Sequence, residues 1–263
     1  MSDSPTVLVT NDDGIESAGL WALVRAVMQS AGRVVVVAPE ENQSAVGSGF
    51  TLRRELNWKR YEAEGMPAVE AWTVDGTPAD CVTIAMDKIL DEEAIELVVS
   101  GINQGANVGQ DVLASGTVGG AMAGHWRGKP AIAYSMAMEE PSADRDWSAA
   151  ERVATDITRA QLAGDLPGGL LLNVNVPHQS YDNIAGILAT RMGRHGYVRL
   201  KQRGEGSAML ERQYDVHTDP VTAPGTDIWA LAHRYISVSP LHSNLTNHQL
   251  VDQLAERLNA TFA

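Results

Sequence analysis

Two adjacent aspartates, Asp12 and Asp13, are the residues whose types and spacing most directly suggest chemistry. They stand in the run NDDG, in which Gly14 permits a tight turn. Two unpaired carboxylates side by side repel each other unless a cation neutralises them. A helix start would need only one of these acids, which the helix dipole would favour. The run therefore predicts either a cation site or a helix cap.

A second polar segment, at residues 101–111, carries Asn103 and Asn107 among glycines that are spaced four residues apart. This spacing differs from the dinucleotide fingerprint G-x-G-x-x-G, and the chain contains no Walker motif. The two asparagines could offer amide oxygens to a hard cation, or they could cap neighbouring backbone groups. The segment alone does not separate these two roles.

Ser115, Gly116 and Thr117 begin a stretch of small residues with a helical pattern. The N-terminus of a helix presents unsatisfied N–H groups and the positive end of its dipole, so two hydroxyls there suit a bound phosphate. Because Ser and Thr are also ordinary N-caps, this run is a weak signal by itself.

The four strongest ligand candidates share oxygen donors and follow predicted strands; they are Asp12, Asp13, Ser44 and Asn103. Such donors suit Mg²⁺, Mn²⁺ or Ca²⁺, whereas Zn²⁺ would call for His and Cys. A cation beside a phosphate-binding helix start predicts phosphate-ester or nucleotide chemistry.

Secondary-structure elements must position these residues. In the first half of the sequence, short apolar runs alternate with helical patterns, which is typical of a parallel sheet covered by helices. Continuous apolar runs predict buried strands at 6–10, 33–38, 96–100, 130–135 and 171–176. Apolar residues at helical spacing predict helices at 20–28, 78–89, 116–126, 147–162 and 247–258. Because ligands of such sheets bind beyond the carboxyl ends of the strands, we expect Asp12 and Asp13 to face a crevice there.

Two regions are less regular. Residues 51–75 suggest an antiparallel excursion, and short alternating segments beyond residue 183, such as 213–218, predict hairpins before a strand at 235–238. This later region is either an insertion or a dimerisation arm.

Composition narrows the partners. The chain of 263 residues has 20 Lys and Arg against 33 Asp and Glu, a net charge of −13 that argues against a face for long nucleic acids. No apolar stretch is long enough for a membrane span, and the first residues lack an export pattern, so we expect a cytoplasmic protein. The one cysteine, Cys81, excludes an intrachain disulfide and is expected in the core.

At the residues singled out above, the sequence resembles the SurE family, stationary-phase survival acid phosphatases that act as 5′/3′-nucleotidases. The resemblance covers most of the chain and is carried by ordered motifs at residues 9–14, 38–47, 75–81, 98–111, 115–122, 173–177 and 225–241. Two positions depart from the family pattern. Ala114 stands where a Tyr commonly precedes Ser-Gly-Thr, and Ala123 stands where an acidic residue is frequent.

The resemblance implies an α/β fold with a Rossmann-like, three-layer core and a mostly parallel sheet. The core would span residues 1–182, and residues 183–263 would form a hairpin and helix extension that is exchanged between the subunits of a homodimer or homotetramer. Within that fold, the activity would be metal-dependent hydrolysis of nucleoside 5′- and 3′-monophosphates.

The resemblance also assigns residues. One divalent cation per subunit, Mg²⁺ or Mn²⁺, or Ca²⁺ in a crystal, would lie on residues that match the family's ligands: Asp12, Asp13, Ser44 and Asn103. The substrate phosphate would meet Asn11, Gly47, Asn107, Ser115, Gly116 and Thr117. Asp12 and Asp13 would also be catalytic, one of them as general base or nucleophile, with the two roles not apportioned.

Two other functions stay open at this point. A non-catalytic sensor could bind a metal and a nucleotide without turnover. A nucleotide-sugar transferase could use the paired aspartates to hold a metal-bound diphosphate.

Overall fold

A nine-stranded sheet runs through the computed structural model, which describes residues 5–138, 145–194, 198–212 and 223–262. Its strands are β1 (Thr6–Thr10), β2 (Arg33–Pro39), β3 (Trp58–Tyr61), β4 (Glu70–Val74), β5 (Ile95–Gln104), β6 (Ala131–Ala137), β7 (Leu171–Pro177), β8 (Gly186–Ala189) and β11 (Tyr235–Pro240). A separate hairpin consists of β9 (Val198–Gly204) and β10 (Ser207–Arg212). The α-helices are α1 (Ala18–Val27), α2 (Pro78–Ile84), α3 (Gly116–Trp126), α4 (Ser148–Leu162), α5 (Asp227–Ala232) and α6 (His248–Phe262).

The strand order is β3-β4-β2-β1-β5-β6-β7-β11-β8. The strands from β4 to β7 are parallel to one another, while β3 is antiparallel at one edge and β11 is antiparallel to β7. From β1 the chain builds outward through β2 on one side and later through β5 on the other. The order therefore reverses between β1 and β5, and the mostly parallel sheet confirms the predicted α/β fold class.

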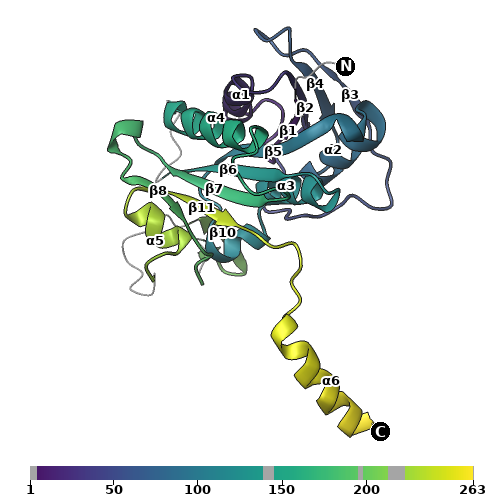
Figure 1. The fold of residues 1–263 in the computed structure, drawn as a ribbon, viewed down its shortest axis with the longest axis vertical. Helices are drawn as coiled ribbons and strands as arrows, with labels where there is room; N and C mark the ends of the chain where they lie inside the picture. Colours follow the sequence, from purple (N-terminus) through teal and green to yellow (C-terminus); the bar gives the residue numbers. More distant parts are fainter. Residues whose placement is uncertain (1–4, 139–144, 195–197, 213–222, 263) are drawn as a thin grey trace.

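Two helical layers cover the sheet (Figure 1). Val7 and Val9 of β1 belong to the apolar core shared with α1 and α4, and Leu8 between them belongs to the core shared with α2 and α3. Successive side chains of a strand point to opposite faces. A strand buried on both faces therefore needs a continuous apolar run, which is the pattern that β1 shows.

The start of α2 follows its sequence signals closely. Thr77 is the N-cap, Pro78 is the first helical residue, and Thr77 and Asp80 form the reciprocal bonds of a capping box. Cys81 in this helix is buried, as predicted, and burial raises the pKa of its thiol well above the ordinary value. A thiol held neutral in an apolar core is a packing residue rather than a nucleophile.

Some boundaries differ from the sequence expectations. The segment 51–75 contains the expected antiparallel pair, β3 with β4, but β4 also pairs in parallel with β2. The predicted strand at 96–100 continues as β5 to Gln104, with a register shift against β6 between Ser100 and Asn103.

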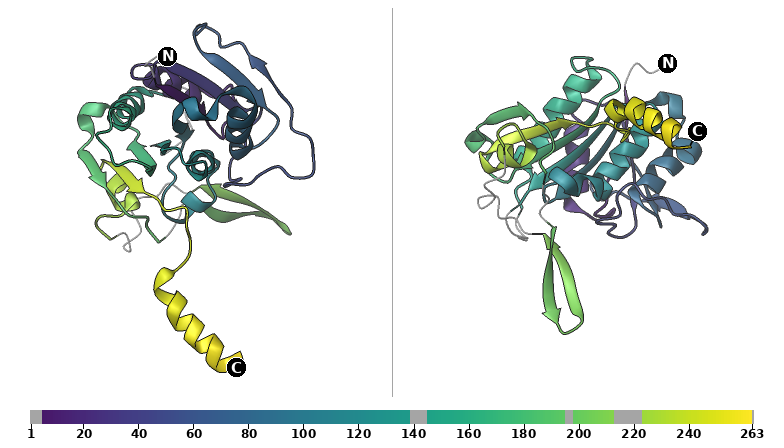
Figure 2. Two further views of the ribbon diagram at one scale, coloured as in Figure 1. Left: turned by 45° about the vertical axis from the view of Figure 1, so that its right-hand side comes forward. Right: turned by 90° about the horizontal axis from the view of Figure 1, so that it is seen from below.

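The C-terminal region contributes to both the sheet and the periphery. The hairpin predicted at 213–218 lies outside the described residues, and the β9–β10 hairpin projects from the body instead (Figure 2). β8 and β11 join the main sheet although they follow residue 183, so the division at residue 182 stays a prediction.

The last helix, α6, extends away from the body of the chain (Figures 1 and 2). It begins at His248, one residue after the predicted start at 247, and continues beyond 258 to Phe262; its residues Leu250, Leu254 and Leu258 are exposed. Among the described residues, no helix is both long and apolar enough to cross a membrane.

Candidate active site

The paired aspartates lie where the strand order reverses. Asp12 and Asp13 follow β1 directly, and Asn103 is the penultimate residue of the neighbouring strand β5. In open α/β sheets this reversal is where ligands bind, beyond the carboxyl ends of the strands. The helix-cap interpretation of the aspartates is wrong, because α1 begins only at Ala18 and its N-cap is Ser17.

The loop that carries Ser44 lies against both aspartates. The Gln43 N–H donates to the Asp12 carbonyl at 2.7 Å, and Asn42 Nδ2 donates to Asp13 Oδ1 at 3.3 Å. The Ser44 N–H in turn donates to Asn42 Oδ1 at 2.9 Å. The structure thus brings Ser44 into the site through backbone contacts, and its side chain is exposed.

The end of β5 meets the other side of Asp13. The Gln104 N–H donates to Asp13 Oδ2 at 3.3 Å, and Asn103 Nδ2 donates to the Gly105 carbonyl at 2.7 Å. The second bond uses the amide nitrogen of Asn103, so its oxygen is the atom that could bind a cation.

Arg145 is a site neighbour that the sequence interpretation missed. Its guanidinium donates to the side-chain oxygen of Gln104, which places a positive charge close to the acidic loop. In the sequence it stands between Asp144 and Asp146, remote from every motif, and nothing there marks it as different from other surface arginines.

The start of α3 abuts Asp12, which is only 2% exposed. The Thr117 hydroxyl donates to Asp12 Oδ1 at 2.6 Å, and Ser115 caps the helix by accepting from the Val118 N–H at 3.1 Å. At Gly116 a Cβ atom would lie 2.7 Å from Asp12 Cβ. Only glycine lets the helix approach this closely.

Gly47 and Asn11 support the same loops. Gly47 is buried with a left-handed φ of 60°, and its N–H donates to the Ala114 carbonyl at 2.9 Å, which ties its loop to the residue before Ser115. Asn11 Nδ2 donates to the Gly14 carbonyl at 3.0 Å. Asn11 Oδ1 is buried and has no hydrogen-bond partner among the described residues.

Asn107 is fully buried and joins the site through α3. Its Nδ2 donates to Ser135 Oγ at 2.9 Å and approaches Thr117 Oγ1 at 3.4 Å. Asn107, Thr117 and Asp12 therefore form one connected polar chain. Of the two departures from the family pattern, Ala114 is exposed beside this site, whereas Ala123 is buried in the core under α2 and α3.

The donors fit a hard divalent cation. In the described part of the chain, no three His, Cys, Asp or Glu side chains converge as metal ligands. A cation here would need amide and hydroxyl oxygens beside the two carboxylates, which is an all-oxygen set of the kind that Mg²⁺, Mn²⁺ and Ca²⁺ accept. The orphaned Asn11 Oδ1 adds another buried oxygen next to Asp12.

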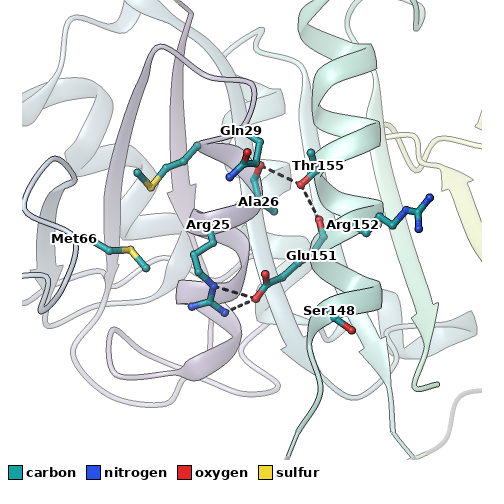
Figure 3. A pocket seen from close by; sticks show the side chains of 9 residues that line it. Arg25, Ala26, Gln29, Met66, Ser148, Glu151, Arg152 and Thr155 are labelled. Carbon is teal, nitrogen blue, oxygen red and sulfur yellow. Dashed lines mark hydrogen bonds and ion pairs between the residues drawn. The ribbon is translucent and has the colours of Figure 1, made fainter. Parts of the chain in front are cut away.

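A groove elsewhere on the surface is unrelated to these residues. It lies between α1 and α4, has a volume of about 520 Å³, and includes Arg25, Gln29 and Thr155 in its wall (Figure 3). Arg25 is engaged in an ion pair with Glu151 across the groove. None of the predicted site residues lines it.

Comparisons with known proteins agree with the geometry. A family model described as "Survival protein SurE" matches residues 7–199. Two proteins named "5'-nucleotidase SurE" are similar: that of Moorella thermoacetica is 43% identical over 258 residues, 96% of each chain, and that of Aquifex aeolicus is 38% identical over 256 residues, 95% of this chain and 97% of that protein. The crystal structure of the SurE protein from Aquifex aeolicus superimposes with a TM-score of 0.81 at 36% identity, covering 97% of this chain and 100% of that one. The resemblance found in the motifs is thus confirmed, and the chain belongs to the SurE family.

Proposed function

We propose that this protein is a metal-dependent phosphomonoesterase that hydrolyses nucleoside 5′-monophosphates, and also 3′-monophosphates, to nucleoside and phosphate. The observation that carries the proposal is the 2.6 Å contact between Thr117 and the buried Asp12. It sets a carboxylate against a helix start whose N–H groups suit a phosphate. The name "5'-nucleotidase SurE" of the two relatives supports the same activity.

Asp12, Asp13, Asn103 and Ser44 are the residues that would hold one divalent cation, Mg²⁺ or Mn²⁺. Bound there, a divalent cation supplies charge stabilisation to phosphoryl oxygens and favours ionisation of water. The chain contributes the rest of the oxygen-binding surface. The backbone N–H groups at the start of α3 would donate to phosphoryl oxygens, and the buried Asn107 amide, which donates to Thr117 and Ser135, would hold Thr117 in place beside them.

The hydroxyl groups of Ser115 and Thr117, at the start of α3, each have a hydrogen-bond partner that is compatible with a phosphate bound nearby. Ser115 Oγ accepts from the Val118 N–H, so its own hydrogen can be donated to a phosphoryl oxygen. Thr117 donates to Asp12, which keeps that carboxylate at the edge of the phosphate position. In hydrolysis, water oxygen bonds to phosphorus, the ester P–O bond breaks, and the leaving nucleoside oxygen takes up a proton. One of the two aspartates would act as general base, or as nucleophile in a two-step route.

Phosphate release measures the proposal directly. Purified protein should release phosphate from nucleoside monophosphates with Mg²⁺ or Mn²⁺, and EDTA should abolish the release. Asp12→Asn and Asp13→Asn should each lose activity while remaining folded. Wild-type rates in both variants would contradict the proposal, binding without turnover would favour a sensor, and sugar transfer without monophosphate release would favour a transferase.

The proposed assembly is a homodimer or homotetramer in the cytoplasm. The exposed leucines of α6 support an assembly, because an amphipathic helix that extends from its own body leaves its apolar side without intramolecular cover. A reduced, buried Cys81 suits a reducing compartment. Light scattering on the purified protein would give the subunit number.

A further inference from the structure

Two motifs that the proposed chemistry does not use converge on the backbone of residues 105–109. The first is at 173–177 in β7. Asn175 Oδ1 accepts from the Asn107 N–H at 2.8 Å, and its Nδ2 donates back to the Asn107 carbonyl at 3.0 Å. Asn173 Nδ2 donates to the same carbonyl at 2.8 Å. Both polar groups of the Asn107 backbone are thus held by side chains of one strand.

The second motif, at 225–241, supplies Asp227 at the start of α5. Its Oδ2 accepts from the Gly109 N–H at 2.7 Å, and its Oδ1 accepts from the N–H groups of Gly193 and Ile228 at 2.7 and 2.8 Å. Asp227 is fully buried. A buried carboxylate is tolerated when backbone donors surround it, and removing one oxygen leaves a donor unsatisfied.

Apolar packing fixes the alternate residues of the same segment. Ala106 and Val108 form a small cluster with Ile228 and Leu231 of α5. The segment therefore packs on α5 through Ala106 and Val108, while the backbone of Asn107 between them is bonded to the β7 asparagines. Asn107 has no freedom to shift without breaking one of these contacts.

The segment leads to the site through Asn107 itself. The Asn107 amide reaches Ser135 on β6 and Thr117 on α3, and Thr117 bonds to Asp12. A displacement of the Asn107 backbone would consequently weaken the hold of its amide on Thr117, and it would affect Asp12 through the Thr117 hydroxyl. Buried polar networks that are fully satisfied specify one geometry, and partly satisfied ones lose it.

We propose that Asn175 and Asp227 are positioning residues, which hold the backbone of residues 107–109 so that the Asn107 amide keeps Thr117 in place at the proposed phosphate site. This inference rests on the proposed function. It also means that the phosphate site needs α5, which lies beyond the 7–199 region matched by the family model.

The test uses variants that keep side-chain shape. Asn175→Asp retains the acceptor for the Asn107 N–H and loses the donor to its carbonyl, and Asp227→Asn loses one of two acceptor oxygens. Thr158→Val is the matched control, because it removes a buried hydrogen bond, 3.0 Å to the Tyr134 hydroxyl, in the α4 layer. Thermal unfolding of each variant establishes that it folds. If Asp227→Asn does not, Asn175→Asp and Asn173→Asp carry the test.

Three quantities are measured in the full-length protein: KM for a nucleoside 5′-monophosphate, the inhibition constant of inorganic phosphate, and the cation concentration for half-maximal activity. In the positioning variants we expect the first two to rise about tenfold, the effect of one unsatisfied buried group. The cation concentration for half-maximal activity should change less than these two quantities, because Asn107 is linked to Asp12 through Thr117. The control should match the wild type in all three.

A double variant separates positioning from general destabilisation. If Asn175 acts through Asn107, Asn175→Asp adds nothing once Asn107→Ala has removed the amide, whereas independent effects multiply. Multiplied losses, or an unchanged KM and phosphate inhibition in both positioning variants of an active enzyme, would overturn the positioning role alone. A wild-type protein that releases no phosphate would overturn the proposed function and this inference together.

Discussion

Replacing Gly116 with alanine probes the contact between α3 and the acidic loop. The new Cβ would lie 2.7 Å from Asp12 Cβ, 2.9 Å from Asp12 Oδ2 and 3.0 Å from the Gln43 carbonyl oxygen. Carbon atoms normally pack at about 3.5–4.0 Å, so Asp12 or the helix start must move by about 1 Å. Misplacement of this size costs roughly 100-fold in rate, equivalent to about 2.7 kcal/mol of transition-state stabilisation.

The loss of stability should be small enough for the protein to fold. Overpacking lowers the free energy of unfolding by about 1–3 kcal/mol, and exchanging a helical glycine for alanine offsets at most about 1 kcal/mol of this loss. The backbone of Gly116 has no left-handed φ, so alanine adds no backbone strain. The protein should therefore fold and still lose most of its kcat/KM.

The assay is phosphate release from a nucleoside 5′-monophosphate over a range of substrate and cation concentrations, together with thermal unfolding. Gly168→Ala is the matched control, because a Cβ there would meet no heavy atom within 4 Å and the residue has no left-handed φ. Wild-type kcat/KM in a folded Gly116→Ala protein would refute the placement of Asp12 in the catalytic machinery.

Four further outcomes are expected. Thr117→Val removes the donor to Asp12 Oδ1, and a bond to a charged group is worth about 1.5–3 kcal/mol, so kcat/KM should fall roughly 10- to 100-fold in the phosphate-release assay. Asp80→Asn breaks the capping box of α2 and should lower the thermal midpoint by about 2–4 °C with KM unchanged, as differential scanning calorimetry and initial rates would show. Hydrogen bonds from the side chain and backbone of Asn57, and then from Arg54, hold the pKa of Asp75 below its ordinary value of 3.8. A carboxyl group whose pKa is lower in the folded state stabilises the fold at pH values above its unfolded pKa, and this contribution is lost as the pH falls through the folded pKa. Asp75→Asn should therefore reduce the loss of stability on acidification below about pH 4, as measured by urea titrations at several pH values. Serine in place of Leu250, Leu254 and Leu258 together should lower the mass measured by light scattering if α6 is an assembly helix, and an unchanged mass would exclude it from the interface.

Local signals account for most of the secondary structure. The valines of β2 and the capping box of α2 are continuous in the sequence, and each fixes its element without reference to the rest of the chain. The end of β5 is different, because its last residues are a polar run that contains Gly101. That run is in strand only because Asn103 and Gln104 pair with Ser135 and Met136 of β6, more than thirty residues away.

In the candidate site, too, local features could be predicted from the sequence and contacts between distant residues could not. The aspartates and the start of α3 were recognisable because each occupies a position that parallel sheets and helices use for ligands. Their contact was not recognisable, since Asp12 and Thr117 are 105 residues apart. Asn173 and Asn175 did carry a usable signal: residues two apart in a buried strand share one face, so two asparagines there call for a polar partner inside the protein. Asp227 carried none, because an acid after Thr226 has the pattern of an ordinary helix start.

The acidic composition is compatible with the proposed phosphate site because electrostatic interactions in salt solution act over a short distance. A net charge of −13 acts on a distant polyanion, but screening in physiological salt limits surface charges to about 8 Å. The proposed site would present the N-terminus of α3, the Arg145 guanidinium, which donates to the Gln104 side chain, and a divalent cation on the aspartates. By binding the proposed cation, the two aspartates would reverse the local field. An acidic surface would therefore exclude long nucleic acids while the proposed site accepts a single nucleotide phosphate.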